Sequence, residues 1–131
     1  MFTLPSALSF LIFLISSIYI TYPLILNLGS SAVDLADSYF IAWTMNWNIH
    51  ALFTNPLNLF SAPIYYPYVN SLAFSDFFIT SSLFAAIPLK LIGTPISAVN
   101  FTLISSIFMV GFFTFLLSFY ITKNFLASIL S

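Results

Sequence analysis

Charged side chains are the scarcest feature of this sequence. Its 131 residues include only two Lys or Arg and three Asp or Glu, 4% of the chain, whereas 61% are hydrophobic. A water-soluble domain normally carries about a quarter charged residues, so this chain cannot keep a soluble surface hydrated. We therefore predict an integral membrane protein whose main partner is the lipid bilayer.

Cysteine is absent and histidine occurs once, at His50. These absences exclude a disulfide framework and a thiolate metal site, and they argue against a transition-metal site built by the protein alone. A hard cation held by carboxylates and a substrate phosphate stays compatible with the sequence. The net charge of -1 and the lack of a basic patch argue against nucleic acid as a partner. The sequence carries no glycine-rich phosphate loop, and it leaves any cofactor unknown.

Three long apolar runs predict an all-α fold with about three membrane spans. Residues 8–28 are long enough, at roughly 1.5 Å per residue, to cross a bilayer core of about 30 Å. Residues 77–92 are short for a span and contain Pro88, so they form either a short or kinked span or a helix that enters the bilayer partway. Residues 96–121 can cross with tilt, and Asn100 near their start is expected to face protein.

The first run has a second interpretation, a cleaved signal peptide ending near Ser30 and Ser31. The run is too long for the apolar part of a signal peptide, and no Lys or Arg precedes it, which favours an uncleaved span. The sequence specifies the orientation in the membrane only weakly. Lys90 and Lys123 end successive apolar runs, so they lie on opposite sides of the membrane if both runs cross, and the positive-inside rule then favours neither orientation.

Residues 29–76 form a polar, aromatic-rich insert that holds every acidic residue, His50 and both tryptophans. A helix is predicted over 37–53, capped by Asp34 or Asp37 and stopped by Asn55 and Pro56. On a helical wheel its aromatic side chains share one arc and three polar ones form a narrow stripe. This pattern is typical of an interfacial helix, or of a helix buried in a larger bundle. The aromatic arc is Tyr39, Phe40, Trp43 and Trp47; the stripe is Asp37, Thr44 and Asn48.

The rest of the insert reads as a proline-rich loop. Tyr65, Tyr66 and Tyr68 are expected at its hydrated edge. Ser75 and Asp76 have the side chains of an N-cap, so the next helix is predicted to begin at residue 77.

Each ionisable residue of the insert has two interpretations. An Asp just outside a span is a candidate general base or cation ligand, since a carboxylate near the bilayer can have its pKa raised. Asp is also a leading helix cap, and capping explains Asp34, Asp37 and Asp76 equally well. His50 is a candidate substrate or cation ligand, or a polar residue at the end of an interfacial helix.

A longer pattern runs through the insert as DS-x4-W-x3-W-x2-HAL, NPL-x-LF-x-AP and YP-x2-NSLAFSD. Its residues are Asp37 and Ser38, Trp43, Trp47, His50 to Leu52, Asn55 to Leu57, Leu59 and Phe60, Ala62 and Pro63, Tyr66 and Pro67, and Asn70 to Asp76. This pattern resembles the first extracytoplasmic loop of the GT-C class of polytopic membrane glycosyltransferases. The last part of the pattern is the most specific.

The resemblance implies a helical bundle in the plasma membrane of a prokaryote, with residues 29–76 facing outside. It implies sugar transfer from a polyprenyl-phosphate donor, with Asp37 as the catalytic base and Asp34 as its neighbour. Asp76 would be a second acidic residue at the end of the loop. From the residues themselves, His50 is a candidate substrate or cation contact, and Trp43, Trp47 and Tyr66 are expected at the membrane interface.

The chain ends seven residues into a fourth apolar run, where GT-C enzymes continue through many more spans. We therefore expect residues 1–131 to be the N-terminal membrane region of a longer enzyme, inactive alone. The alternative is a small non-catalytic membrane protein or an orphan fragment.

Overall fold

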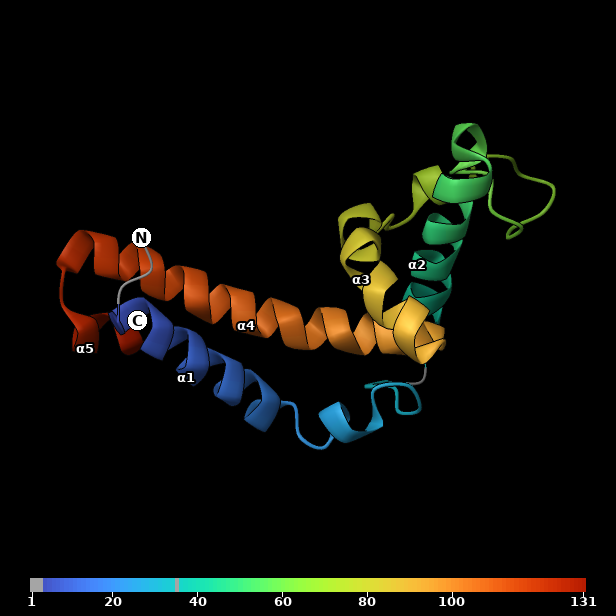
Figure 1. Cartoon of the computed structure of the whole chain (residues 1–131). Coiled ribbons are helices and arrows are strands. Elements are labelled where there is room, and N and C mark those ends of the chain that lie inside the picture. The colour runs from blue at the N-terminus through green and yellow to red at the C-terminus, as the bar shows by residue number, and fades with distance from the viewer. Residues whose placement is uncertain (1–3, 35) are drawn as a thin grey trace. The chain divides into compact units, whose positions relative to one another are not determined.

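The computed structural model describes residues 4–34 and 36–131, and within these ranges the regular structure is entirely helical. Figure 1 shows the elements in chain order. They are α1 (Leu4–Ile20), η1 (Leu24–Asn27), α2 (Asp37–Thr54), η2 (Pro56–Asn58), η3 (Ser71–Phe74), α3 (Ile79–Ile92), α4 (Pro95–Thr122) and α5 (Phe125–Ile129).

In the described part of the chain, one helix is long and apolar enough to cross a membrane. It is α4, with 28 residues, where the sequence predicts a span over 96–121. The other apolar helices have 17 residues in α1 and 14 in α3. At 1.5 Å per residue these reach about 26 Å and 21 Å, less than a bilayer core of about 30 Å. Three spans are therefore an expectation that the helix lengths do not confirm.

The predicted continuous run over 8–28 is divided in the structure. Helix α1 ends at Ile20, and residues Leu24–Asn27 form a separate short 3-10 helix. Pro23 explains the break, because a proline disfavours helical geometry in the residue before it and donates no backbone hydrogen bond.

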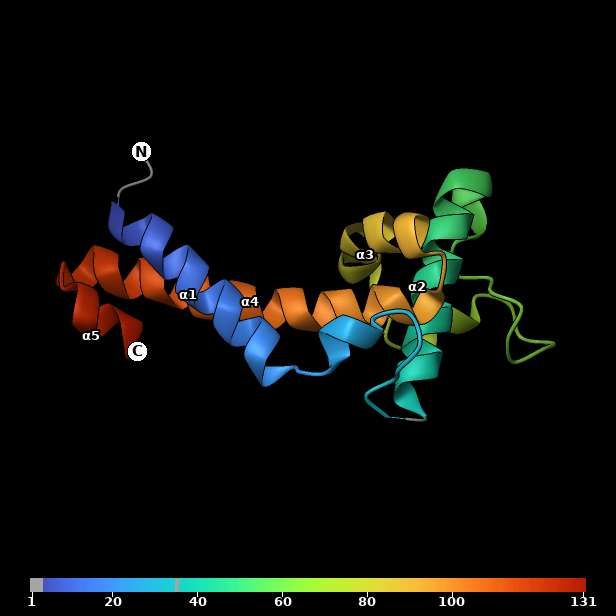
Figure 2. The ribbon, with the colours of Figure 1, turned by 60° about the horizontal axis from the view of Figure 1, so that its bottom comes forward.

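The chain divides into two compact units. The first comprises Met1–Leu26 with Leu103–Ser131, and the second comprises Asn27–Thr102. In the first unit aromatic rings connect α1 to α4, two helices that lie side by side there (Figure 2). The Phe10 ring lies 4.9 Å from Phe108 and 5.5 Å from Phe112, both edge-on, and Phe13 lies 6.3 Å from the fully buried Phe115.

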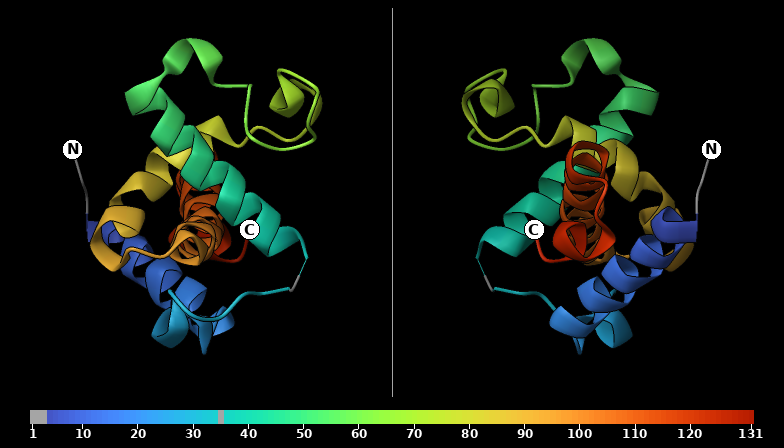
Figure 3. Two further views of the ribbon diagram at one scale, coloured as in Figure 1. Left: turned by 90° about the vertical axis from the view of Figure 1, so that its right-hand side faces the viewer. Right: turned by 90° about the vertical axis from the view of Figure 1, so that its left-hand side faces the viewer.

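The second unit is built on the pairing of α2 with α3 (Figure 1). Met45 of α2, Ala85 of α3 and Ala98 of α4 form its small core, and Ile41 and Val99 pack against it. Between α2 and α3 the chain leaves the end of α2, makes a loop that includes η2 and η3, and returns to α3 (Figure 3). Unit two therefore holds the whole polar insert on a small helical frame.

Helix α3 begins two residues later than the sequence predicts. Its N-cap is Phe78, which has φ 50° and no side-chain cap, so the predicted cap by Ser75 and Asp76 is wrong. A distant residue explains the shift, because the Asn48 side chain of α2 donates to the Phe77 carbonyl and holds this segment outside the helix. Helix α3 contains Pro88 and continues through it to Ile92.

Candidate functional site

Asp34 caps the start of α2 from two residues before the N-cap position, which is Ala36. Its Oδ1 accepts hydrogen bonds from the backbone N–H groups of Ala36 and Asp37, both at 2.8 Å, and its Oδ2 accepts from the Ser38 hydroxyl at 2.8 Å. The Ser38 hydrogen bond is the main cause that lowers the pKa of Asp34, and the backbone donors add to it. A carboxylate so stabilised in its charged form is a poor proton acceptor.

Asp37 stands in a different environment, although it lies only three residues away. It is the first residue of α2, exposed to solvent, and its own N–H binds Asp34. Among the described residues, no hydrogen bond or ion pair is formed by its carboxylate. Asp37 is thus an exposed carboxyl group whose oxygen atoms have no partner among the described residues.

The aromatic arc of α2 is a stack of rings. Phe40, Trp43 and Trp47 follow one another with ring centroids 6.4 Å apart, and the two indoles are within 12° of parallel. His50 continues the series, with its ring 5.9 Å from Trp47. Trp47 also donates its indole N–H to the Leu59 carbonyl at 2.9 Å. This bond fixes the ring and ties the following loop to α2.

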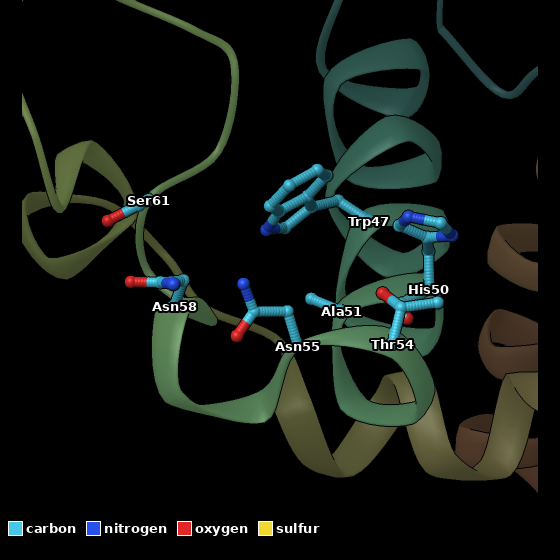
Figure 4. A pocket seen from close by; sticks show the side chains of 7 residues that line it. All are labelled: Trp47, His50, Ala51, Thr54, Asn55, Asn58 and Ser61. Carbon is cyan, nitrogen blue, oxygen red and sulfur yellow. The ribbon is translucent and has the colours of Figure 1, made fainter.

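A pocket of about 440 Å³ opens beside the C-terminal end of α2 (Figure 4). The side chains of Trp47 and Asn55 extend from the C-terminal end of α2 toward the loop that carries Asn58 and Ser61. Its seven lining residues are Trp47, His50, Ala51, Thr54, Asn55, Asn58 and Ser61. Sequence reasoning found only the first two, and it interpreted Asn55 with Pro56 as a helix stop.

The predicted site residues do not form one centre. Asp37 and His50 lie at opposite ends of α2, about 20 Å apart by the helical rise of 1.5 Å per residue. Asp76 is exposed on the segment between η3 and α3, and Tyr66 is 96% exposed on the loop. No group of three His, Cys, Asp or Glu side chains that could hold a metal ion occurs among the described residues.

Two of the three residues of the polar stripe, Thr44 and Asn48, turn inward, whereas Asp37 is exposed. Asn48 and Thr44 are fully buried, and the Asn48 amide donates to the Phe77 carbonyl and to the Ser82 hydroxyl, at 2.5 and 3.1 Å. Asn100 of α4 is also fully buried and donates to the carbonyls of Leu28 and Ser31 at 2.8 and 2.7 Å. The expectation that Asn100 faces protein is confirmed. The two amides thus connect the helices of the second unit to its loop segments, and this unit carries Asp37 and the pocket.

Neither a family model, nor a curated protein, nor a solved structure matches the chain.

Proposed function

We propose that this chain carries the acceptor-activating carboxylate of a membrane glycosyltransferase of the GT-C type. The observation that supports this most is the contrast between two neighbouring carboxylates. Asp34 is committed to capping α2, whereas Asp37 is exposed and its oxygens have no partner among the described residues. The resemblance of the insert assigns the base to the same residue, Asp37.

In the proposed reaction Asp37 accepts the proton of an acceptor hydroxyl. The hydroxyl oxygen attacks the anomeric carbon of the donor sugar, and the bond from that carbon to the phosphate oxygen breaks. The products are the glycosylated acceptor and polyprenyl phosphate, with inversion at the anomeric carbon. General base catalysis of this kind contributes about 10²–10⁴-fold to the rate.

The proposal places α4 across the plasma membrane of a prokaryote and the insert on the outer surface. The length and apolar composition of α4 support a membrane location. The half-exposed Trp43 and Trp47 suit a helix at headgroup level. A polyprenyl-phosphate donor is confined to the bilayer, so a base at its surface meets both substrates.

The test compares Asp37→Asn with Asp34→Asn in the full-length enzyme in membrane vesicles, with transfer from a radiolabelled polyprenyl-phosphate sugar as the readout. Asp37→Asn keeps the size of the side chain and removes its basicity, so we expect a loss of about 10²–10⁴-fold. Asp34→Asn is the matched control, because Asn is as good a cap as Asp, and its rate should stay within a few-fold of the wild type. Normal transfer by Asp37→Asn would refute the assignment of the base.

A non-catalytic helical component of a membrane complex is the second candidate. The wide separation of Asp37 from the pocket favours it, because one small active centre would bring these groups together. A full-length wild-type protein that transfers no sugar from any polyprenyl-phosphate donor, yet copurifies with other membrane proteins, would support this alternative over the enzyme.

A further inference from the structure

We infer that the pocket at the C-terminal end of α2 binds a neutral carbohydrate unit. Its volume of about 440 Å³ falls within the range of about 300–1,000 Å³ found for small-molecule sites. The inference goes beyond the proposed function and does not rest on it, because binding can be measured without any transfer reaction.

The Trp47 indole supplies the flat surface that a sugar ring needs. Trp43 precedes Trp47 by one helical turn and stacks nearly parallel to it, so it lies on the side of the indole toward the helix N-terminus. On its other side the His50 ring lies 5.9 Å away, tilted by 46°, and both Trp47 and His50 line the pocket. The hydrogen bond from the indole N–H to the Leu59 carbonyl holds the ring in place before a ligand arrives. A fixed aromatic face is suited to the C–H groups of a pyranose.

The remaining lining supplies hydrogen bonds without charge. Asn55 and Asn58 contribute two side-chain amides, each with donors and an acceptor, and neither amide is bonded to another described residue. Ser61 is already engaged, since it donates to the Asn70 side chain at 2.9 Å, and this bond steadies the loop wall. Hydroxyl groups both donate and accept, so they match the amides directly.

The class of ligand follows from what the lining contains. Its seven residues include no Asp, Glu, Lys or Arg, and His50 is the one ionisable side chain among them. No permanently charged side chain is therefore present to offset the desolvation of a phosphate or a carboxylate. A purely apolar ligand would leave both amides unpaired, at a cost. A neutral polyhydroxylated ligand satisfies the aromatic face and the amides together.

The experiment uses the full chain in a detergent that contains no sugar. Trp43→Phe leaves Trp47 as the single tryptophan, because the sequence has two. Its emission is recorded against maltose, cellobiose and N-acetylglucosamine, with glucose 6-phosphate as the charged comparison. We expect a saturable change with at least one neutral sugar and weaker binding of the phosphate.

Two further variants in the same background locate the site. Asn55→Ala with Asn58→Ala should weaken binding about tenfold, since two hydrogen bonds are lost. Asn46→Ala, an exposed asparagine of α2 outside the pocket, should bind as the parent does. No saturable change with any neutral sugar, binding of glucose 6-phosphate as tight as that of the sugars, or equal effects of the two variants would each overturn the inference.

Discussion

The two units of this chain are held together by different forces. In the first, Ser9 and Ser17 of α1 donate to carbonyls three residues earlier in their own helix, and phenylalanine rings make contacts between α1 and α4. In the second, Asn48 and Asn100 donate to backbone carbonyls of other segments. Dispersion thus stabilises the first unit, and directional hydrogen bonds position the second.

The difference coincides with the distribution of charge. Four of the five charged residues belong to the second unit, and Lys123 alone belongs to the first. A unit assembled by directional bonds can keep carboxylates and amides in fixed places, whereas packed phenylalanines carry no such chemistry. The comparison teaches that a candidate site is to be sought in Asn27–Thr102.

The largest effect is expected in the first unit, for Phe115→Ala. Phe115 is fully buried, with 0% of its surface accessible. Its ring lies near those of Phe13, Phe119 and Phe125. Removing it leaves a cavity that costs about 3–5 kcal/mol. Denaturant unfolding of the protein in bicelles measures this loss, and the exposed Phe113→Ala is the control. Equal stability of the two variants would contradict the packing described for this unit.

In the second unit we expect Asn100→Leu to cost about 2–4 kcal/mol. The substitution keeps the bulk of the side chain but leaves the carbonyls of Leu28 and Ser31 without their donor, and each unpaired buried group costs about 1–3 kcal/mol. The same unfolding measurement applies. If the apolar isostere proved as stable as the wild type, directional bonding would not be what holds this unit.

Two glycines, one in each unit, lie where an added methyl group would meet a neighbouring side chain. A Cβ at Gly111 would lie 2.5 Å from the Phe13 ring, whereas one at Gly29 would lie 2.9 Å from the Thr94 hydroxyl and 3.0 Å from an Ile92 methyl group. Gly111→Ala should therefore destabilise by about 1–3 kcal/mol through overpacking. Gly29→Ala meets its neighbours at longer distances than Gly111→Ala does, so its cost should be smaller. Melting temperatures of the two variants, compared side by side, would refute this if their order were reversed.

The smallest effect concerns the cap of α2 and its dependence on pH. Because Ser38 lowers the pKa of Asp34 below the usual 3.8, the cap contributes stability above that value and loses it as the pH falls through the folded-state pKa. A carboxyl-carbon NMR titration should give a midpoint for Asp34 below 3.8, and Ser38→Ala should move it upward. A wild-type midpoint at or above 3.8 would contradict the hydrogen bonds described.

Local signals predicted part of the fold correctly. The helix expected over 37–53 corresponds to α2, Asp37–Thr54, because its cap at Asp34 and its stop at Asn55 and Pro56 are adjacent in sequence. The start of α3 could not be foreseen, because it depends on Asn48, 29 residues before Phe77. The end of α1 was missed because the apolar sequence pattern continues past Pro23, whereas the helix ends at Ile20.

The candidate site was predictable only in its aromatic and acidic members. The pattern of α2 pointed to Asp37, Trp47 and His50, but it could not show that Asp34 alone carries the cap. The pocket amides lie after the helix stop, on a turn whose path depends on the bond from Trp47 to Leu59. The local sequence around Asn55 and Asn58 does not distinguish a residue that contacts a ligand from a turn residue.

The bonds made by Trp47 and Asn100 also imply an order of assembly. Trp47 reaches across 12 residues to Leu59, whereas Asn100 reaches across 69 residues to Ser31. The entropy of closing a loop grows as about (3/2)RT ln n, so the longer closure costs about 1.5 kcal/mol more. We therefore expect the hairpin-like turn around Trp47 to form early, while the chain is still emerging, and the Asn100 contact to form late. A nascent chain stopped short of residue 100 would then already contain its aromatic stack.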